Sequence, residues 1–148
     1  MSKIIENLYL GNIDDVQSVK FIRENNIKLI INAAIEVIVP IHEDVNIIMN
    51  LQWHDSMEQS INFCFLDYLT NVIHSFLKEN KALLVNCFAG ISRSSTIVIA
   101  YMMKYHNMTF DEAFNYVKSK RWIVNPNPNF RIILKNYERY LLDNKQSL

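Results

Sequence analysis

Two residues with complementary chemistry stand close together in the sequence: the thiol of Cys87 and the guanidinium of Arg93, with five residues between them. A short apolar run, 82–85, precedes this segment and a longer one, 97–103, follows it, which predicts a buried strand, a tight loop and a buried helix. Amides of such a loop and of the helix start form an anion site, and the planar fork of Arg93 suits phosphate oxygens. Helix N-termini and nearby cations favour the thiolate form of cysteine. The segment therefore predicts a nucleophile inside a phosphate-binding loop.

The strands that must hold this loop are predicted from short apolar runs. The runs 28–32 and 45–53 are rich in β-branched residues and predict two further strands. Residues 4–10 predict either a single strand or a hairpin, which ends at Gly11. We also expect a short strand at 36–41.

Helices are predicted from their caps and apolar stripes. Asn12 caps a helix that continues to about Ile22, and a long amphipathic helix covers 60–79. Two more helices begin at the capping box Thr109–Glu112 and at Asn127-Pro128. This order of elements predicts an α/β fold, with a central mixed, mostly parallel sheet of about five strands and helices on both faces.

The composition is that of an ordinary globular domain. The 148 residues, half of them hydrophobic, predict one domain, 1–148, with a core of its own. The 15 basic and 15 acidic side chains balance, which argues against nucleic acid or a membrane as a general partner. The only cysteines are Cys64 and Cys87, which favours a reducing location, and we expect the cytoplasm with access to the nucleus. Cys64 is expected to be a buried free thiol on the inner side of its helix. We find no signal-peptide core and no apolar run of membrane-spanning length.

The segment from Cys87 to Ser94 closely resembles the signature loop of the dual-specificity protein phosphatases, and its Ala-Gly-x-Ser-Arg-Ser portion has the form typical of that family. The segment 5–12 also resembles the family, as does Arg121 followed by 125–130. This resemblance implies a cysteine-based phosphatase fold with a shallow pocket that needs no metal or other cofactor. It implies a catalytic domain that dephosphorylates phosphotyrosine and phosphoserine or phosphothreonine in a phosphorylated protein substrate.

The resemblance also assigns roles within the loop. Cys87 is the nucleophile that forms a phosphocysteine intermediate, and Arg93 binds two oxygens and stabilises the transition state. Ser94 donates its hydroxyl to the sulfur in the second step, or bonds the backbone of the first helical turn, and both roles are compatible. Gly90 is one of only two glycines, so we expect it to allow close approach or a positive φ. The phosphate-binding amides are those of Phe88, Ala89, Gly90, Ile91, Ser92 and Arg93.

The leaving group needs a proton from an acid on a loop near the cysteine. Asp55 directly follows the predicted strand 45–53 and lies 32 residues before Cys87, close to the spacing of the family's general acid. We assign that role to Asp55, which then acts as the base on water. The adjacent His54 points the opposite way on an extended chain, so no catalytic pair is expected. The other candidate acids are Glu43, Asp44, Glu58 and Asp67.

Two asparagines are expected to support the loop. Asn86 stands where the family usually has histidine, and its amide keeps a donor without ever carrying charge. Asn125 either orders the signature loop by hydrogen bonds or is a plain turn residue before Pro126.

Asn86 also motivates an alternative function, a catalytically weak module that binds phosphorylated partners. A phosphatase for lipids or nucleic-acid 5′ ends is a third hypothesis. It is disfavoured by the zero net charge and by the uncharged loop residues Phe88, Ala89 and Ile91. The expected partner is therefore a phosphorylated protein.

Overall fold

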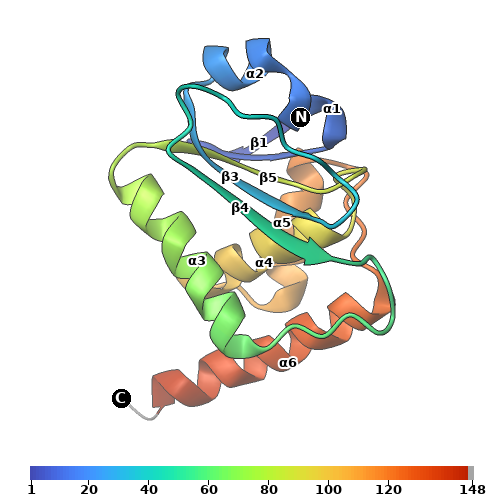
Figure 1. The fold of residues 1–148 in the computed structure, drawn as a ribbon. Helices are drawn as coiled ribbons and strands as arrows, with labels where there is room; N and C mark the ends of the chain where they lie inside the picture. The colour runs from blue at the N-terminus through green and yellow to red at the C-terminus, as the bar shows by residue number, and fades with distance from the viewer. Residues whose placement is uncertain (147–148) are drawn as a thin grey trace.

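The computed structural model describes residues 1–146, and at its centre a five-stranded sheet lies between two layers of helices (Figure 1). The strand order is β1-β2-β5-β3-β4. The first two strands form an antiparallel hairpin, and all the other neighbours are parallel. The predicted mixed, mostly parallel sheet is thus confirmed. The strands are β1 (Ser2–Ile5), β2 (Leu8–Gly11), β3 (Ile27–Ala34), β4 (Ile47–Trp53) and β5 (Ala82–Asn86).

The helices cover both faces of the sheet (Figure 1). Two short helices, α1 (Ile13–Gln17) and α2 (Val19–Glu24), lie on one face. The other face is covered by α3 (Phe63–Lys78), α4 (Arg93–Tyr105), α5 (Phe110–Lys120) and α6 (Pro128–Gln146). Helix α4 is buried from Arg93 to Met103: its first turn is polar, and its apolar stretch 97–103 is buried all round, as the sequence predicts.

The signature segment joins two largely buried elements of the fold. Strand β5 is completely buried, and the loop after it leads directly into α4. Strands β3 and β4 run parallel to β5, so the loops at their carboxyl ends meet at the same edge of the sheet. In open α/β sheets this edge is where ligands bind.

The segment from Asn12 to Glu24 forms two helices and not the single one expected. Asn12 caps the first through the predicted capping interaction, with Asp15 as its partner. Ser18 then leaves the helical conformation, ends α1 and caps α2 by accepting the amide of Phe21. A serine that competes for nearby backbone amides favours such a break.

The strand expected at 36–41 is absent, and that prediction was wrong. The chain turns after β3, where the Val37 amide donates to the Ala34 carbonyl at 3.3 Å. The buried Asn32 side chain binds the carbonyls of Ala34 and Val37 and so fixes the turn. Pro40 has no amide proton to donate to a sheet.

Cys64 is exposed, so its expected burial was wrong as well. The buried positions of α3 are Leu66, Leu69, Thr70 and Ile73. Cys64 precedes Leu66 by two residues and therefore faces away from that stripe.

The predicted capping box of α5 and the predicted start of α6 at Pro128 are confirmed.

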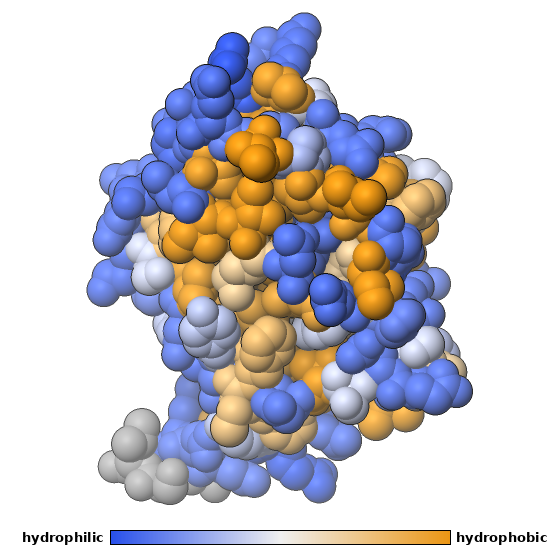
Figure 2. All heavy atoms as spheres, viewed as in Figure 1, coloured by the Kyte–Doolittle hydropathy of each residue, from blue (hydrophilic) through white to orange (hydrophobic). Residues whose placement is uncertain are grey.

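Apolar side chains gather on the surface over β4 and the loop before it (Figure 2). Ile38 and Ile41 in this loop are 80% and 92% exposed, and Ile35 and Ile47 at its two ends are also exposed. Strand β4 is an edge of the sheet. Within residues 1–146, no helix has the length and apolar character needed to cross a membrane.

Candidate active site

Other segments of the chain fix the loop after β5 by donating hydrogen bonds to its carbonyl oxygens. The amide of Ile13 donates to the Phe88 carbonyl at 3.0 Å, and the amide of Asn125 donates to the Ile91 carbonyl at 2.9 Å. Arg121 Nε donates to the Gly90 carbonyl at 2.9 Å. In the part of the chain that the structure describes, the amides of 88–93 have no acceptor. These amides, with the start of α4, remain available for an anion.

Gly90 has the geometry that only glycine tolerates easily. Its φ is +67°, in the left-handed region. A Cβ placed on Gly90 would lie 2.7 Å from the Gly11 carbonyl oxygen and 2.5 Å from Arg121 Nη2. Both needs foreseen for this glycine, positive φ and close approach, are present.

Cys87 and Ser94 meet at the base of the loop. Cys87 Sγ lies 3.1 Å from Ser94 Oγ, and both residues are buried. The Ser94 hydroxyl is therefore positioned to donate a hydrogen bond to the sulfur when the sulfur is charged. The Cys87 amide also donates to the Gly11 carbonyl, which ties β5 to β2 at this point.

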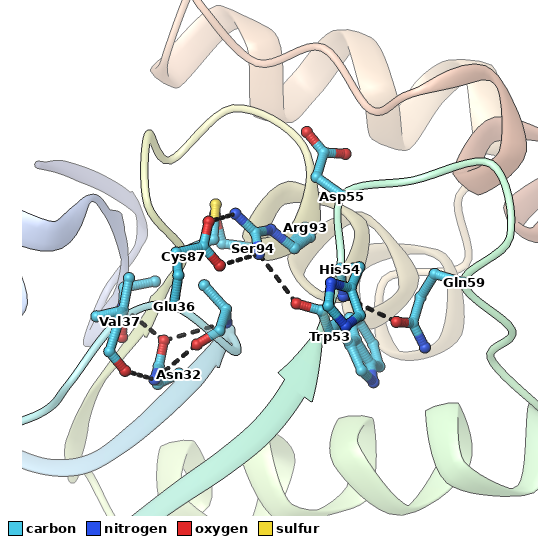
Figure 3. A network of polar contacts seen from close by, with 12 residues as sticks. Asn32, Glu36, Val37, Trp53, His54, Asp55, Gln59, Cys87, Arg93 and Ser94 are labelled. Carbon is cyan, nitrogen blue, oxygen red and sulfur yellow. Dashed lines mark hydrogen bonds and ion pairs between the residues drawn. The ribbon is translucent and has the colours of Figure 1, made fainter.

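Arg93 is held by a carboxylate that the sequence analysis did not identify. Both of its terminal nitrogens donate to the carboxylate oxygens of Glu36 at 2.6 Å, and Nη1 also donates to the Trp53 carbonyl at 2.9 Å (Figure 3). The side chain of Arg93 is 7% exposed and that of Glu36 is 46% exposed. Hydrogen bonding from Arg93 lowers the pKa of Glu36. Burial acts to lower the pKa of Arg93, but the hydrogen bond and the charge of Glu36 raise it overall.

The remaining nitrogen of Arg93 is left without a partner. Nε is buried and makes no hydrogen bond within the described chain. Since a buried N–H donor normally finds an acceptor, this group is available for an oxygen of a bound ligand. Glu36 thus fixes the plane of the guanidinium and leaves the Nε edge free.

Asn86 supports the Glu36 loop and not the signature loop. Its Nδ2 donates to Asn32 Oδ1 at 3.1 Å. Asn32 in turn binds the carbonyls of Ala34 and Val37, on either side of Glu36. The Asn86 Oδ1 atom is buried and accepts no hydrogen bond from residues 1–146.

Asp55 lies on the loop after β4, where it is bound by an asparagine from the start of α6. Asn127 Nδ2 donates to Asp55 Oδ1 at 2.7 Å, and the Asn127 amide donates to Ser92 Oγ at 2.9 Å. The same side chain caps α6 by accepting the Phe130 amide. Asn127 therefore connects the carboxylate to the signature loop. His54 and Asp55 project in different directions (Figure 3).

Asn125 supports the loop through its backbone. Its backbone amide donates to the Ile91 carbonyl, whereas its side-chain oxygen accepts a hydrogen bond from Arg131.

Asp67, one of the other candidate acids, accepts hydrogen bonds from the hydroxyl groups of Tyr137 and Tyr140.

The residues missed by sequence reasoning are Glu36, Asn127 and Arg121. Each of them lies next to a predicted boundary: Glu36 at the start of the strand wrongly expected at 36–41, Asn127 at the cap of the last helix, and Arg121 after the end of the helix before it. Asn127 and Arg121 were noted only as a cap and as part of a family segment. Position next to a boundary was the one signal that could have marked them.

Comparison with known proteins agrees with this geometry. The family model described as "Dual specificity phosphatase, catalytic domain" matches residues 8–140. Human dual specificity protein phosphatase 14 is 35% identical over 150 residues, which cover 95% of this chain and 70% of that protein. Human dual specificity protein phosphatase 21 is 33% identical over 143 residues, which cover 97% of this chain and 74% of that protein. The chain spans only 21% of human dual specificity protein phosphatase 16, to which it is 37% identical over 138 residues.

Solved structures give the same result. The crystal structure of DUSP15 superposes with a TM-score of 0.84 at 31% identity, covering 97% of this chain and 95% of that one. A human tyrosine phosphatase-like serine/threonine/tyrosine-interacting protein superposes with a TM-score of 0.87 at 31% identity, covering 96% and 97%. The match of sequence and fold along most of its length shows that this chain belongs to the dual specificity phosphatase family of protein phosphatases.

Proposed function

We propose that this chain hydrolyses phosphate esters of tyrosine and of serine or threonine in proteins through a phosphocysteine intermediate at Cys87. The observation that carries the proposal is the approach of Cys87 Sγ and Ser94 Oγ to 3.1 Å beneath a loop whose amides have no acceptor among residues 1–146. The free Nε of the buried Arg93 adds a donor at the same place. Such preorganised donors are worth most in a buried site, where charge develops on the transferring group.

The first step transfers the phosphoryl group to sulfur. The Cys87 thiolate attacks phosphorus, the S–P bond forms, and the ester P–O bond breaks on the opposite side. Asp55 gives its proton to the leaving alkoxide or phenolate oxygen. The amides of 88–93 and Arg93 hold the three non-bridging oxygens.

The second step releases phosphate. Asp55, now a carboxylate, takes a proton from water while the water oxygen attacks phosphorus. The S–P bond breaks, and the Ser94 hydroxyl donates a hydrogen bond to the departing sulfur. The product is inorganic phosphate, and the thiolate and the protonated Asp55 are restored. Apart from substrate and water, all the groups that these two steps need belong to the chain itself, so we propose a reaction without a cofactor.

The alternative of a weak phosphate-binding module rests only on Asn86. The contact of Asn86 with Asn32 supports the Glu36 loop and leaves the Cys87–Ser94 pair intact, which favours turnover.

We also propose that residues 1–148 act as one catalytic domain in the cytoplasm, with access to the nucleus, because the nucleophile must stay a reduced thiol. Both cysteines are free, as this location would require.

Aryl phosphate hydrolysis tests the proposal, with Cys64→Ser as the matched control for Cys87→Ser. Cys87→Ser should reduce turnover to background and abolish the acid-stable phosphoenzyme that forms from radiolabelled substrate, because hydroxyl is a far weaker nucleophile. Cys64→Ser, at the exposed cysteine, should leave both unchanged. Arg93→Lys should lower kcat by roughly 10²–10³-fold, since an ammonium cannot replace the planar fork. Label retained in Cys87→Ser, or full activity in Arg93→Lys, would contradict the proposal.

A further inference from the structure

Arg121 is a buried arginine outside the Cys-x5-Arg segment that reaches the back of the signature loop. It directly follows α5, where its own amide is bound by the Val117 carbonyl. Only 9% of its surface is exposed. Its Nε donates to the Gly90 carbonyl at 2.9 Å, and its Nη2 donates to the Ala89 carbonyl at 3.4 Å. A single guanidinium thus binds two consecutive carbonyls of the loop.

These two carbonyls belong to the turn that sets the direction of the amides. Gly90 adopts φ +67°, and Arg121 Nη2 occupies the space that a Cβ would fill. Because a carbonyl held on the outside of a turn directs the neighbouring amide to the inside, Arg121 favours the phosphate-binding shape of the loop. The third bond of the guanidinium, from Nη1 to Ser2 Oγ at 3.2 Å, anchors it to β1.

Arg93 has a carboxylate partner that neutralises its charge, whereas Arg121 has none among the described residues. Glu36 forms an ion pair with Arg93 at 2.6 Å. Among the residues that the structure describes, no carboxylate lies within ion-pair distance of Arg121. Asp15 acts on Arg121 only at longer range, and Asp15 itself pairs with the N-terminal ammonium at 3.4 Å. Burial lowers the pKa of Arg121, while the negative charges of Asp15 and ionised Cys87 oppose that shift.

We propose that Arg121 is a positioning residue with two separable effects: its fork holds the signature loop in the phosphate-binding shape, and its unpaired charge favours the Cys87 thiolate. This inference deepens the proposed function and rests on it for its catalytic meaning. The two arginines have different roles in this proposal. Arg93, neutralised by Glu36, supplies directed donors to the ligand, and Arg121 supplies net positive charge from behind the loop.

The test uses the Cys64→Ser background, so that Cys87 is the only thiol, and needs no turnover. One measurement is the midpoint pH of Cys87 alkylation by iodoacetamide. The other is the concentration of inorganic phosphate that halves the rate of Cys87 alkylation. Arg121→Met removes both the planar guanidinium fork and the positive charge. Arg121→Lys removes the fork and keeps the charge. Lys118→Met is the matched control, because Lys118 binds the carbonyls of Trp122 and Val124 and not the signature loop.

Arg121→Met should move the alkylation midpoint to higher pH and raise the protecting phosphate concentration by about tenfold, as loss of a charge-assisted contact would. Arg121→Lys should keep the midpoint near that of the parent but still weaken protection. Lys118→Met should change neither. If Arg121→Met behaves as Lys118→Met does in both measurements, the proposal is wrong. If Arg121→Met does not fold, unchanged protection in Arg121→Lys refutes it instead.

Aryl phosphate turnover of the parent protein separates this inference from the proposed function. A parent protein that shows the expected alkylation and protection behaviour but hydrolyses no ester refutes the proposed function and leaves the role of Arg121 supported.

Discussion

Cys87 and Arg93 belong to one short segment, yet they are held by different parts of the molecule. Cys87 is bound within the segment by Ser94 and to β2 through Gly11. Arg93 is bound from outside by Glu36 and by the Trp53 carbonyl. Cys87 is therefore placed by the signature segment and by β2, whereas the guanidinium of Arg93 is placed by the loop after β3 and by the end of β4.

Asp55→Asn tests the proposed acid. It should lower kcat for a phosphotyrosine or phosphoserine peptide by roughly 10²–10⁴-fold, because these leaving groups need a proton. It should matter much less for an aryl phosphate with a good leaving group. The measurement is kcat for both substrates, with Glu58→Gln in the same loop as control. Equal loss on both substrates, or a larger loss in Glu58→Gln, would move the role to another residue.

The turn after β3 shows how one buried side chain positions an element. Asn32 binds both sides of the Glu36 turn and also accepts from Asn86 and donates to Asn50. Asn32→Leu should reduce the free energy of unfolding by about 2–3 kcal/mol, because it leaves buried polar groups unpaired.

Asn50→Leu is the matched control for Asn32→Leu, since Asn50 is exposed and keeps access to water. Chemical denaturation should show a much smaller change for it. Because the Glu36 turn loosens only in Asn32→Leu, the KM for an aryl phosphate should rise in that variant alone. Equal stability of the two variants would show that the asparagine network does not hold the turn.

Asp67 of helix α3 connects this helix to α6 and α4 through hydrogen bonds. It accepts from Tyr137 at 2.6 Å, from Tyr140 at 2.8 Å and from Lys104 at 3.1 Å. Burial acts to raise the pKa of Asp67, but these three donors together hold it below the usual 3.8. The folded protein thus binds this proton less readily than the unfolded chain. The stabilisation is full above the unfolded value and is lost as the pH falls through the folded one.

Tyr137→Phe tests this connection between the helices. At neutral pH it should lower the free energy of unfolding by about 1–3 kcal/mol, the range for a hydrogen bond to a charged group. The difference from the parent protein should shrink as the pH falls below the ordinary range of aspartate. Urea denaturation over a pH series measures it, with Tyr116→Phe, whose hydroxyl lies 3.3 Å from a backbone carbonyl, as a control without a carboxylate partner. A pH-independent difference for Tyr137→Phe would contradict the assignment.

The molecule as a whole presents an apolar surface at the edge strand β4 (Figure 2). Exposed isoleucines beside an unpaired strand edge favour association between copies. Ile38→Glu combined with Ile41→Lys keeps the net charge at zero and should reduce self-association at high concentration, measured by light scattering. Because both side chains are already largely exposed, the melting temperature should stay nearly unchanged. Unchanged scattering would show that this surface does not drive association.

Local sequence determined the signature segment, the strand and helix that flank it and the helix caps. The signals are short in range: an apolar run between polar breaks, or a cap and its partner three residues later. Such signals gave the sheet class, the start of α6 at Pro128 and the break after Gly11. They failed where a local competitor acted, as Ser18 did in splitting the first helix and Asn32 did in turning the chain where a strand was expected.

The hydrogen-bond partners of Arg93, Asp55 and Gly90 were decided only by the tertiary structure. Glu36 and Arg93 are 57 residues apart, Asp55 and Asn127 are 72 apart, and Gly90 and Arg121 are 31 apart. No periodicity or cap relates such positions. They meet because the parallel register of β3, β4 and β5 brings three loops to one edge of the sheet, while α5 and α6 end or begin beside it. Contacts of this kind depend on how the elements pack, and packing is a property of the whole core.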